Sequence, residues 1–172
     1  MDWSNLLISV ATGGYDFVSK WGYIGIFLVS LVSSASILLP IPNFILIFTF
    51  GSTLNPFLVA LLASAGSTIG ETTGYILGLG GKEILEKKYR RQLKRMKKMF
   101  EKYGSIVWII ILGASPLPDD IAGVFCGVIK YDFKKYFIAT FIGKFILYLI
   151  LAYSGHYSIG WVLDYVQPRL GL

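Results

Sequence analysis

Charged residues are absent from a long stretch near the start of the chain. The run from Trp21 to Gly70 holds 50 residues without a single Asp, Glu, Lys or Arg. One crossing of a bilayer needs about 20 mostly apolar residues, so this run is long enough to meet lipid more than once. A second apolar stretch follows Lys135. The pattern predicts an integral membrane protein of the all-α class, because only helices and closed barrels satisfy their backbone groups in lipid.

A strongly basic segment separates the apolar stretches. Residues 82–102 hold ten of the sixteen Lys and Arg residues of the chain. Apolar positions inside the segment recur every three or four residues, which is typical of one face of a helix. These positions are Leu85, Tyr89, Leu93, Met96, Phe100 and Tyr103. We expect an amphipathic interfacial helix over about 82–103. The positive-inside rule places 82–102 in the cytoplasm and accounts for the basic residues without nucleic acid.

The segment between Lys102 and Lys130 has basic residues at both ends. If both ends are cytoplasmic, the segment must enter the membrane and return, and its 27 residues are too few for two crossings of about 20. Pro116 and Pro118 interrupt its middle, since proline removes a backbone donor and disfavours helix before it. The segment is therefore predicted to be a re-entrant helical hairpin whose tip lines a cavity.

The same pattern occurs 76 residues earlier, which indicates an internal repeat. Five pairs match: Pro40 with Pro116, Pro42 with Pro118, Asn43 with Asp119, Gly51 with Gly127, and Phe57 with Phe133. Each repeat is predicted to be a re-entrant hairpin followed by a long transmembrane helix, over about 57–80 in the first repeat and 133–153 in the second. The flanking charges give the repeats opposite orientations, and inverted repeats with interrupted helices are typical of secondary transporters.

These elements predict one membrane domain over residues 1–172. Repeat one covers about 21–80, the basic amphipathic helix about 82–103, and repeat two about 104–155. Residues 1–20 and 156–172 are expected to form short interfacial helices. The N-terminus lacks the basic residues that begin a cleavable signal peptide, so we expect none to be removed.

Glu71 lies inside the first long helix. Burying an ionised carboxylate in a membrane is costly, so a functional role is the default interpretation, with simple solvation near the interface as the alternative. Poor solvation favours the protonated acid, which suits a proton carrier. Four glycines spaced by four residues lie beside Glu71 and predict a close helix contact. They are Gly66, Gly70, Gly74 and Gly78.

Other polar residues lie near the predicted hairpin breaks and in the second long helix. Asp119 and Asp120 hinder each other's ionisation, so one of them could hold a proton near pH 7. An Asp after a proline can also cap the following half-helix, and both roles can hold, with Asp119 as the cap and Asp120 facing the cavity. Asn43, at the matching place in the first repeat, would cap without charge. Lys144 lies ten residues beyond Lys134, which is about 15 Å deep. We expect Lys144 to pair with Glu71, Asp119 or Asp120, either as a structural contact or as a cation for a phosphate.

The chain carries no sequence signature of catalysis. It lacks GxSxG, HExxH and P-loop motifs, and its single His156 has no neighbouring nucleophile. A single cysteine, Cys126, excludes an intramolecular disulfide and a cysteine zinc cluster. The chain is therefore not expected to be an enzyme, or to carry a metal or another cofactor.

Three motifs follow one another along the chain. Gly70-Glu71-Thr72-Thr73-Gly74-Tyr75-Ile76-Leu77-Gly78 fits a G-[DE]-x-x-x-Y-x-x-G helix, Lys102-Tyr103-Gly104 fits a turn before a hairpin, and Pro116-Leu117-Pro118-Asp119-Asp120 fits the hairpin itself. In this order, over about residues 20–150, they resemble the DedA family, also called the VTT or SNARE-associated domain.

The resemblance implies a role in lipid movement. Bacterial members of the family are implicated in recycling undecaprenyl phosphate and in proton-dependent homeostasis, and eukaryotic relatives scramble phospholipids. The resemblance assigns the role of the family's functional acidic residues to Glu71 and Asp120. The chain departs from the family in two places: Asn43 stands where many members have a carboxylate, and no arginine accompanies Pro116. Lys144 would supply the missing cation.

The function expected from the sequence is a flippase-like or scramblase-like lipid transporter of the cell membrane. It would translocate the headgroups of polyprenyl phosphates or phospholipids, with proton exchange at Glu71 and Asp120. Membrane lipids and protons are the expected partners, and homo-oligomerisation is left open. Two alternatives are a proton-coupled exporter of small cations or drugs, and a non-transporting assembly factor that holds membrane partners.

Overall fold

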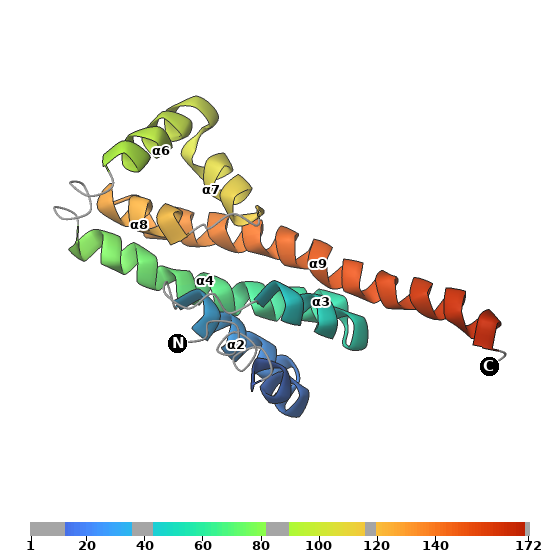
Figure 1. Cartoon of the computed structure of the whole chain (residues 1–172). Helices are drawn as coiled ribbons and strands as arrows, with labels where there is room; N and C mark the ends of the chain where they lie inside the picture. Colours follow the sequence, from blue (N-terminus) through green and yellow to red (C-terminus); the bar gives the residue numbers. More distant parts are fainter. Residues whose placement is uncertain (1–12, 36–42, 82–89, 116–119, 171–172) are drawn as a thin grey trace, which may run out of the picture.

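The computed structural model describes residues 13–35, 43–81, 90–115 and 120–170, and for 92, 120–121 and 159–170 it describes the backbone alone. The regular elements in these ranges are all α-helices, which confirms the predicted all-α class (Figure 1). Residues 13–21 are helical. The helices that follow are α2 (Tyr23–Ala35), α3 (Asn43–Thr53), α4 (Pro56–Gly80), α6 (Arg90–Tyr103), α7 (Ser105–Gly113), α8 (Asp120–Val128) and α9 (Phe133–Leu170).

The first long helix, α4, begins and ends where the sequence predicts. Asn55 caps it, because its Oδ1 accepts hydrogen bonds from the backbone N–H groups of Phe57 at 3.0 Å and Leu58 at 3.2 Å. Pro56 occupies the first turn, where its missing N–H costs nothing. The helix ends at Gly80, so the predicted range 57–80 is confirmed.

The second long helix, α9, is longer than predicted. It runs without a break over 38 residues, and the expectation of a separate interfacial helix at 156–172 is wrong. A glycine inside a helix costs only about 1 kcal/mol. Gly155 offsets that cost by letting α9 approach the backbone carbonyl of Phe48, which a Cβ atom would strike. One described stretch is long and apolar enough to cross a membrane, Phe133–Ser158, with mean hydropathy 1.8.

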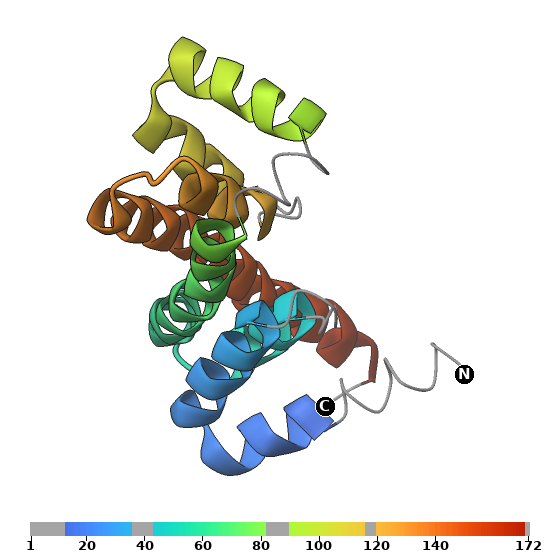
Figure 2. The ribbon, with the colours of Figure 1, turned by 90° about the vertical axis from the view of Figure 1, so that its left-hand side faces the viewer.

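The long helices α4 and α9 lie side by side and run in opposite directions (Figures 1 and 2). Three contacts along their length give the direction. Ser67 meets Tyr148, Glu71 meets Lys144, and the rings of Tyr75 and Tyr136 stack with centroids 5.2 Å apart. Residue numbers therefore rise along α4 as they fall along α9.

The four shorter helices α2, α3, α7 and α8 pack on this pair in a reciprocal pattern. The first helix of each predicted hairpin packs on the long helix of its own half, α2 on α4 and α7 on α9. The second packs on the long helix of the other half, α3 on α9 and α8 on α4. The four predicted hairpin breaks, at Pro40, Pro42, Pro116 and Pro118, lie outside the described residues.

Glycines make three of these packings close. A Cβ on Gly66 or Gly70 would strike the backbone of α2, and one on Gly78 would strike the carbonyl of Val124 on α8. The predicted close contact at the glycine ridge is therefore present, but two different helices share it. Gly74 is buried on the same helix. On α9, a Cβ on Gly143 would strike the carbonyl of Ile110 on α7.

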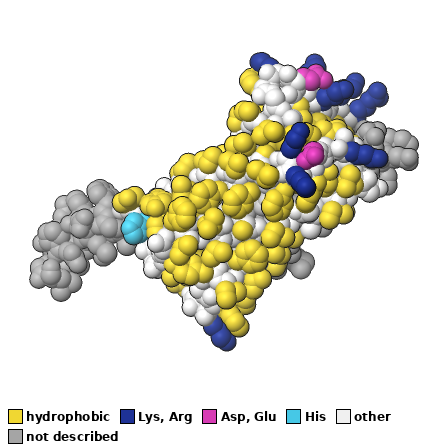
Figure 3. Space-filling model, turned by 180° about the vertical axis from the view of Figure 1, so that it is seen from behind, with side chains coloured by type: hydrophobic (Ala, Val, Ile, Leu, Met, Phe, Trp, Pro, Cys, Tyr) yellow, Lys and Arg dark blue, Asp and Glu magenta, His cyan; other side chains and the backbone are white. Residues whose placement is uncertain are grey.

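Isoleucines form an exposed apolar stripe along α9. Ile138, Ile142, Ile146 and Ile150 recur once per turn and are 58%, 40%, 41% and 59% exposed. Figure 3 shows a continuous apolar band over the middle of the molecule, while Lys and Arg gather at the end that α6 and the α8–α9 turn form. Large exposed apolar areas are rare on soluble monomers, so this surface suits lipid.

Apolar side chains gather in two buried clusters at different heights along α4 and α9. The first includes Val59 and Ala63 of α4 with Leu147 and Ala152 of α9. The second includes Tyr75 of α4, Phe125 and Cys126 of α8, and Tyr136 and Ala139 of α9. Residues 64–71 of α4 and 140–144 of α9 lie between the two clusters, and this is where the polar residues concentrate.

Candidate functional site

A line of buried polar side chains follows the contact between α4 and α9. On α9, Tyr136, Thr140, Lys144 and Tyr148 recur once per turn and are at most 5% exposed. Each of them precedes an isoleucine of the stripe by two residues, which is a rotation of about 200° around the helix, so the two sets lie on opposite faces. On α4 the buried polar residues are Ser64, Ser67, Thr68, Glu71 and Tyr75. We call these nine residues the polar seam; at 1.5 Å per residue it extends about 18 Å along α9.

An ion pair lies at the centre of the polar seam. Nζ of Lys144 lies 2.5 Å from Oε1 of Glu71, and both residues are buried, at 5% and 6% exposure. Each charge alone would lose several kcal/mol of hydration on burial, and the attraction between them offsets this only in good geometry. Removing one of the two charges, or separating them, would therefore leave a buried charge without its counter-charge, at a large cost in free energy.

A small cavity borders Glu71. Its volume for water is about 10 Å³, close to the space that one water molecule needs. Glu71, Tyr136 and Thr140 supply its polar lining, and Ile109, Leu112, Gly113 and Ala122 complete the wall. The hydroxyl of Tyr136 also donates to the backbone carbonyl of Glu71 at 3.4 Å. The charged half of the seam, by which we mean Glu71, Tyr136, Thr140 and Lys144, therefore borders space for water.

Hydrogen bonds without formal charge link the other half of the seam to α2 and α3. Ser30 of α2 donates to Oδ1 of Asn43 at 3.2 Å, and Nδ2 of Asn43 donates to Tyr148 at 3.4 Å and to Ser67 at 3.5 Å. The hydroxyls of Ser67 and Tyr148 are 2.9 Å apart. We add Ser30 and Asn43 to the polar seam, and we call Ser30, Asn43, Ser67 and Tyr148 its neutral half. It joins four helices through side chains that are all buried.

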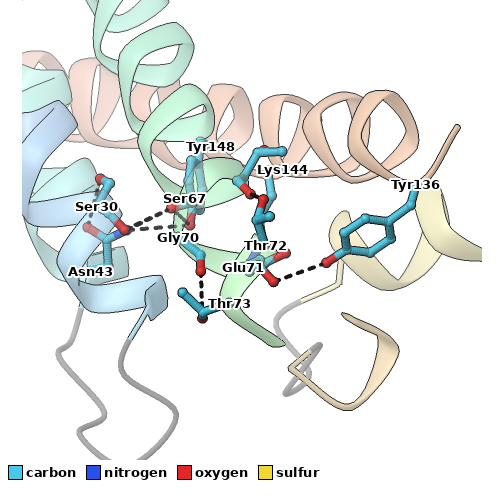
Figure 4. Close-up of polar contacts among 11 residues, drawn as sticks. Ser30, Asn43, Ser67, Gly70, Glu71, Thr72, Thr73, Tyr136, Lys144 and Tyr148 are labelled. Atoms are coloured by element: carbon cyan, nitrogen blue, oxygen red, sulfur yellow. Dashed lines mark hydrogen bonds and ion pairs between the residues drawn. The ribbon is translucent and has the colours of Figure 1, made fainter. Parts of the chain in front are cut away.

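The two halves are adjacent, as Figure 4 shows. Nζ of Lys144 lies 5.9 Å from the ring centroid of Tyr148, within the range of a cation–π contact. On α4, between Ser67 and Glu71 in the sequence, the buried hydroxyl of Thr68 has no hydrogen-bond partner among the described contacts. Buried polar atoms in proteins nearly always have partners, so this hydroxyl is unusual.

The predicted site residues fall into three groups. The structure brings Glu71 and Lys144 together, so of the three carboxylates considered as partners of Lys144, Glu71 makes the contact. Asn43 begins α3, as expected, but its side chain bonds to three other helices. Asp119 lies outside the described residues, and Asp120 is the first residue of α8.

The backbone of α8 approaches the charged half closely. A Cβ on Gly123 would lie 2.8 Å from the hydroxyl of Tyr136 and 3.4 Å from the carbonyl of Glu71. Asp120 precedes Gly123 by three residues, less than one helical turn. The start of α8 therefore lies about one helical turn from the point where α8 contacts Tyr136 and the backbone of Glu71.

Sequence reasoning missed the uncharged members of the seam. Ser30, Ser67, Thr68 and Tyr148 carry no formal charge, and such residues are common in membrane helices. A usable signal was present nonetheless. Polar residues at 136, 140, 144 and 148 repeat every four positions in an otherwise apolar helix, with isoleucine repeating two positions later.

Comparisons with known proteins identify the family of the chain. The family model of the VTT domain matches residues 41–157, which include α3, α4, α6, α7, α8 and most of α9. The "Uncharacterized protein MJ0201" of Methanocaldococcus jannaschii is 29% identical over 134 residues, covering 76% of this chain and 82% of its own length. No solved structure matches. The match over more than half of the chain shows that it belongs to the VTT domain family, the DedA family of membrane proteins.

Proposed function

We propose that this protein translocates the phosphate-bearing headgroup of a membrane lipid, a polyprenyl phosphate or a phospholipid, along the polar seam. The observation that carries the proposal is the buried Glu71–Lys144 pair, because Glu71 borders a small cavity inside the helix contact. The outer surface of the molecule is otherwise suited to lipid. The lipid tails would stay outside against the exposed isoleucines of α9, so only the headgroup needs a polar path.

Proton exchange at Glu71 would control the cation. While Glu71 is ionised, the pair carries no net charge and Lys144 is neutralised. A proton on the carboxylate leaves one positive charge on Lys144, which a phosphate can then neutralise. A lysine ammonium meets phosphate as a point charge, without the two parallel hydrogen bonds of arginine, which suits transient binding during transport. Asp120, about one turn from this site along α8, is the proposed second proton acceptor.

The proposed topology places the two hairpins in the membrane from opposite faces. The reciprocal packing supports it, since α2 with α3 and α7 with α8 contact the two long helices in the same pattern. The residues that flank the two tips also lie at one height. Ala35 accepts a hydrogen bond from Thr73 at 3.4 Å, and Gly113 adjoins Gly143, next to Lys144. Both tips would then meet the seam near the ion pair.

The basic end of the molecule is proposed to face the cytoplasm. Helix α6 carries seven Lys or Arg residues and one Glu, and Lys130, Lys134 and Lys135 surround the start of α9. Concentration of positive charge beside apolar segments is the usual mark of the cytoplasmic side. In this orientation the chain crosses the membrane through α4 and α9, which makes it a multi-pass protein.

Export of small cations or drugs is the competing transport function. It requires a carboxylate that can bind a cation directly, yet Lys144 already neutralises Glu71. The third candidate, a non-transporting assembly factor, does not require a buried ion pair at the centre of the helix contact. The seam therefore favours an anionic headgroup as the transported group.

The experiment that tests the proposal measures lipid movement in proteoliposomes. The variant Glu71→Gln removes the exchangeable proton, and we expect it to abolish translocation of a fluorescent phospholipid or a radiolabelled polyprenyl phosphate. Asp16→Asn is the matched control, because it makes the same chemical change at an exposed residue of the helix at 13–21. Undiminished transport by correctly folded Glu71→Gln protein would remove Glu71 from the mechanism.

A second variant separates transport from a purely structural role of the pair. Replacing a buried ion pair with apolar residues of similar size is often neutral for stability, or stabilising. Glu71→Leu with Lys144→Met should therefore fold as well as the wild type and still fail to transport. If this double variant transported lipid at the wild-type rate, the pair would be only structural.

A further inference from the structure

Helix α6 and the end of α8 enclose a groove that takes no part in the polar seam. Its volume is about 620 Å³, within the range of sites that hold small ligands. We call it the α6 groove. It is lined by Arg90, Leu93, Lys94, Lys97, Phe100 and Glu101 of α6, Phe125 and Val128 of α8, and the adjacent Ile129.

The lining separates into a basic part and an apolar part. Arg90, Lys94 and Lys97 supply three positive charges against the single carboxylate of Glu101, so the net charge of the lining is positive. The apolar part is held in place by aromatic packing. Phe100 meets Phe125 at 5.0 Å between ring centroids, almost perpendicular, and meets Tyr131 at 5.9 Å. Charge and shape together fit a molecule with an anionic head and an apolar tail.

The position of the groove selects a membrane lipid as that molecule. Helix α6 lies at the end of the molecule where Lys and Arg gather, next to the apolar band (Figure 3). Anionic headgroups lie at the corresponding boundary of a bilayer and attract basic segments, while acyl chains lie directly beneath. A soluble phosphate would satisfy the cations but would leave Ile129, which is 43% exposed, without an apolar partner.

We propose that the α6 groove binds one anionic phospholipid, with its phosphate at Lys94 and Lys97 and an acyl chain along the partly exposed Leu93 and Phe100 and the exposed Ile129. This bound lipid is not the transported lipid. It fastens α6 to α8, and Phe125 of α8 belongs to the same buried cluster as Tyr136 of the charged half and Tyr75 next to it. Occupancy of the groove therefore stabilises the end of the molecule that supports the ion pair.

Native mass spectrometry of the whole protein in detergent tests the proposal, with phosphatidylglycerol and phosphatidylcholine as probes. The wild type should retain one phosphatidylglycerol and not phosphatidylcholine. Lys94→Gln with Lys97→Gln should weaken that binding roughly thirtyfold, by the contribution of two basic residues near a lipid surface. Arg95→Gln with Lys98→Gln removes the same charge from the same helix outside the groove lining, and should leave the binding nearly unchanged.

Three results would overturn the proposal. Equal losses in the two double variants would mean diffuse attraction to the basic helix, and equal retention of phosphatidylcholine would mean that the charge is not recognised. Full binding after Leu93→Trp, which fills the apolar part from the α6 side without changing charge, would exclude the groove. Should that variant fail to fold, Ile129→Trp fills the groove from the α8 side at an exposed position. Glu71→Gln should still retain the bound lipid, because Glu71 does not line the groove. Lipid retention and lipid transport are therefore measured separately, and failure of the transport proposal can be distinguished from failure of the groove proposal.

Discussion

The two halves of the polar seam use similar packing but different chemistry. In the neutral half, Asn43 at the start of α3 joins Ser30, Ser67 and Tyr148 through hydrogen bonds of its amide. In the charged half, α8 and α7 approach Glu71 and Lys144. An amide does not gain or lose a proton near neutral pH, whereas a carboxylate can. The neutral half therefore joins the helices through hydrogen bonds, and the charged half is the part to which the proposed function assigns proton exchange.

We expect the largest loss of stability when only one residue of the Glu71–Lys144 pair is replaced. Glu71→Gln leaves Lys144 buried without a counter-charge, which should lower the free energy of unfolding by about 3–5 kcal/mol. Thermal unfolding in detergent measures this loss, and Glu71→Leu with Lys144→Met should recover most of it. If the single and double variants were equally destabilised, the pair would not behave as a buried, coupled unit.

The close contact that brings α8 to α4 should be the next most sensitive feature. Gly78→Val places a side chain against the backbone of Val124, and overpacking of this kind costs about 1–3 kcal/mol. Gly80→Val is the matched control, because a Cβ there meets nothing within 4 Å. Unfolding midpoints in detergent should fall for Gly78→Val alone. A similar fall for both variants would show that helix propensity, and not the contact, is being measured.

The neutral half should be more tolerant. Asn43→Ala removes three interhelical hydrogen bonds, and each such bond in a membrane protein averages about 0.6 kcal/mol. We expect a loss of about 1–2 kcal/mol, with lipid transport in proteoliposomes and its pH dependence retained. Loss of the pH dependence in Asn43→Ala protein that is still folded would contradict the division of the seam into two roles.

The smallest effect is expected at the edge of the charged half. The hydroxyl of Tyr75 donates to the backbone carbonyl of Tyr131 at 2.5 Å, at the turn before α9. Tyr75→Phe keeps the stacked ring and removes this bond, so the unfolding free energy should fall by about 1 kcal/mol. Ser105→Ala, which removes the contact with the side chain of Tyr131, is a useful comparison at the same turn. A loss of transport in Tyr75→Phe would extend the functional site to this edge.

The sequence predicted the elements whose ends carry strong local signals. Asn55 and Pro56 mark the start of α4, and the basic amphipathic helix is confirmed over the described range Arg90–Tyr103. The prediction of a separate helix at 156–172 was wrong because α9 continues through Gly155, which packs against the backbone of Phe48. Local propensity lacks that information, since the contact joins residues more than 100 positions apart.

The candidate site could be predicted only where charge marks it. Glu71 and Lys144 stand out because charges in apolar sequence are rare, but the sequence offers three carboxylates to Lys144, and the contact with Glu71 follows only from the packing of α4 on α9. Ser30 and Ser67 give no such signal, because a serine hydroxyl can be satisfied within its own helix. Their role depends on α2 and α3 being brought to the same height, which is a property of the tertiary fold.

In the proposed topology, two hairpins reach one polar site from opposite faces of the membrane. Single cysteines at Ala35 and Ser115, the described residues next to the two predicted tips, test this after Cys126 is replaced by Ala. In oriented proteoliposomes, a membrane-impermeant thiol reagent should label position 115 from the face that carries α6, and position 35 only from the other face. Labelling of both positions from the same face alone would show that the two hairpins do not enter from opposite sides.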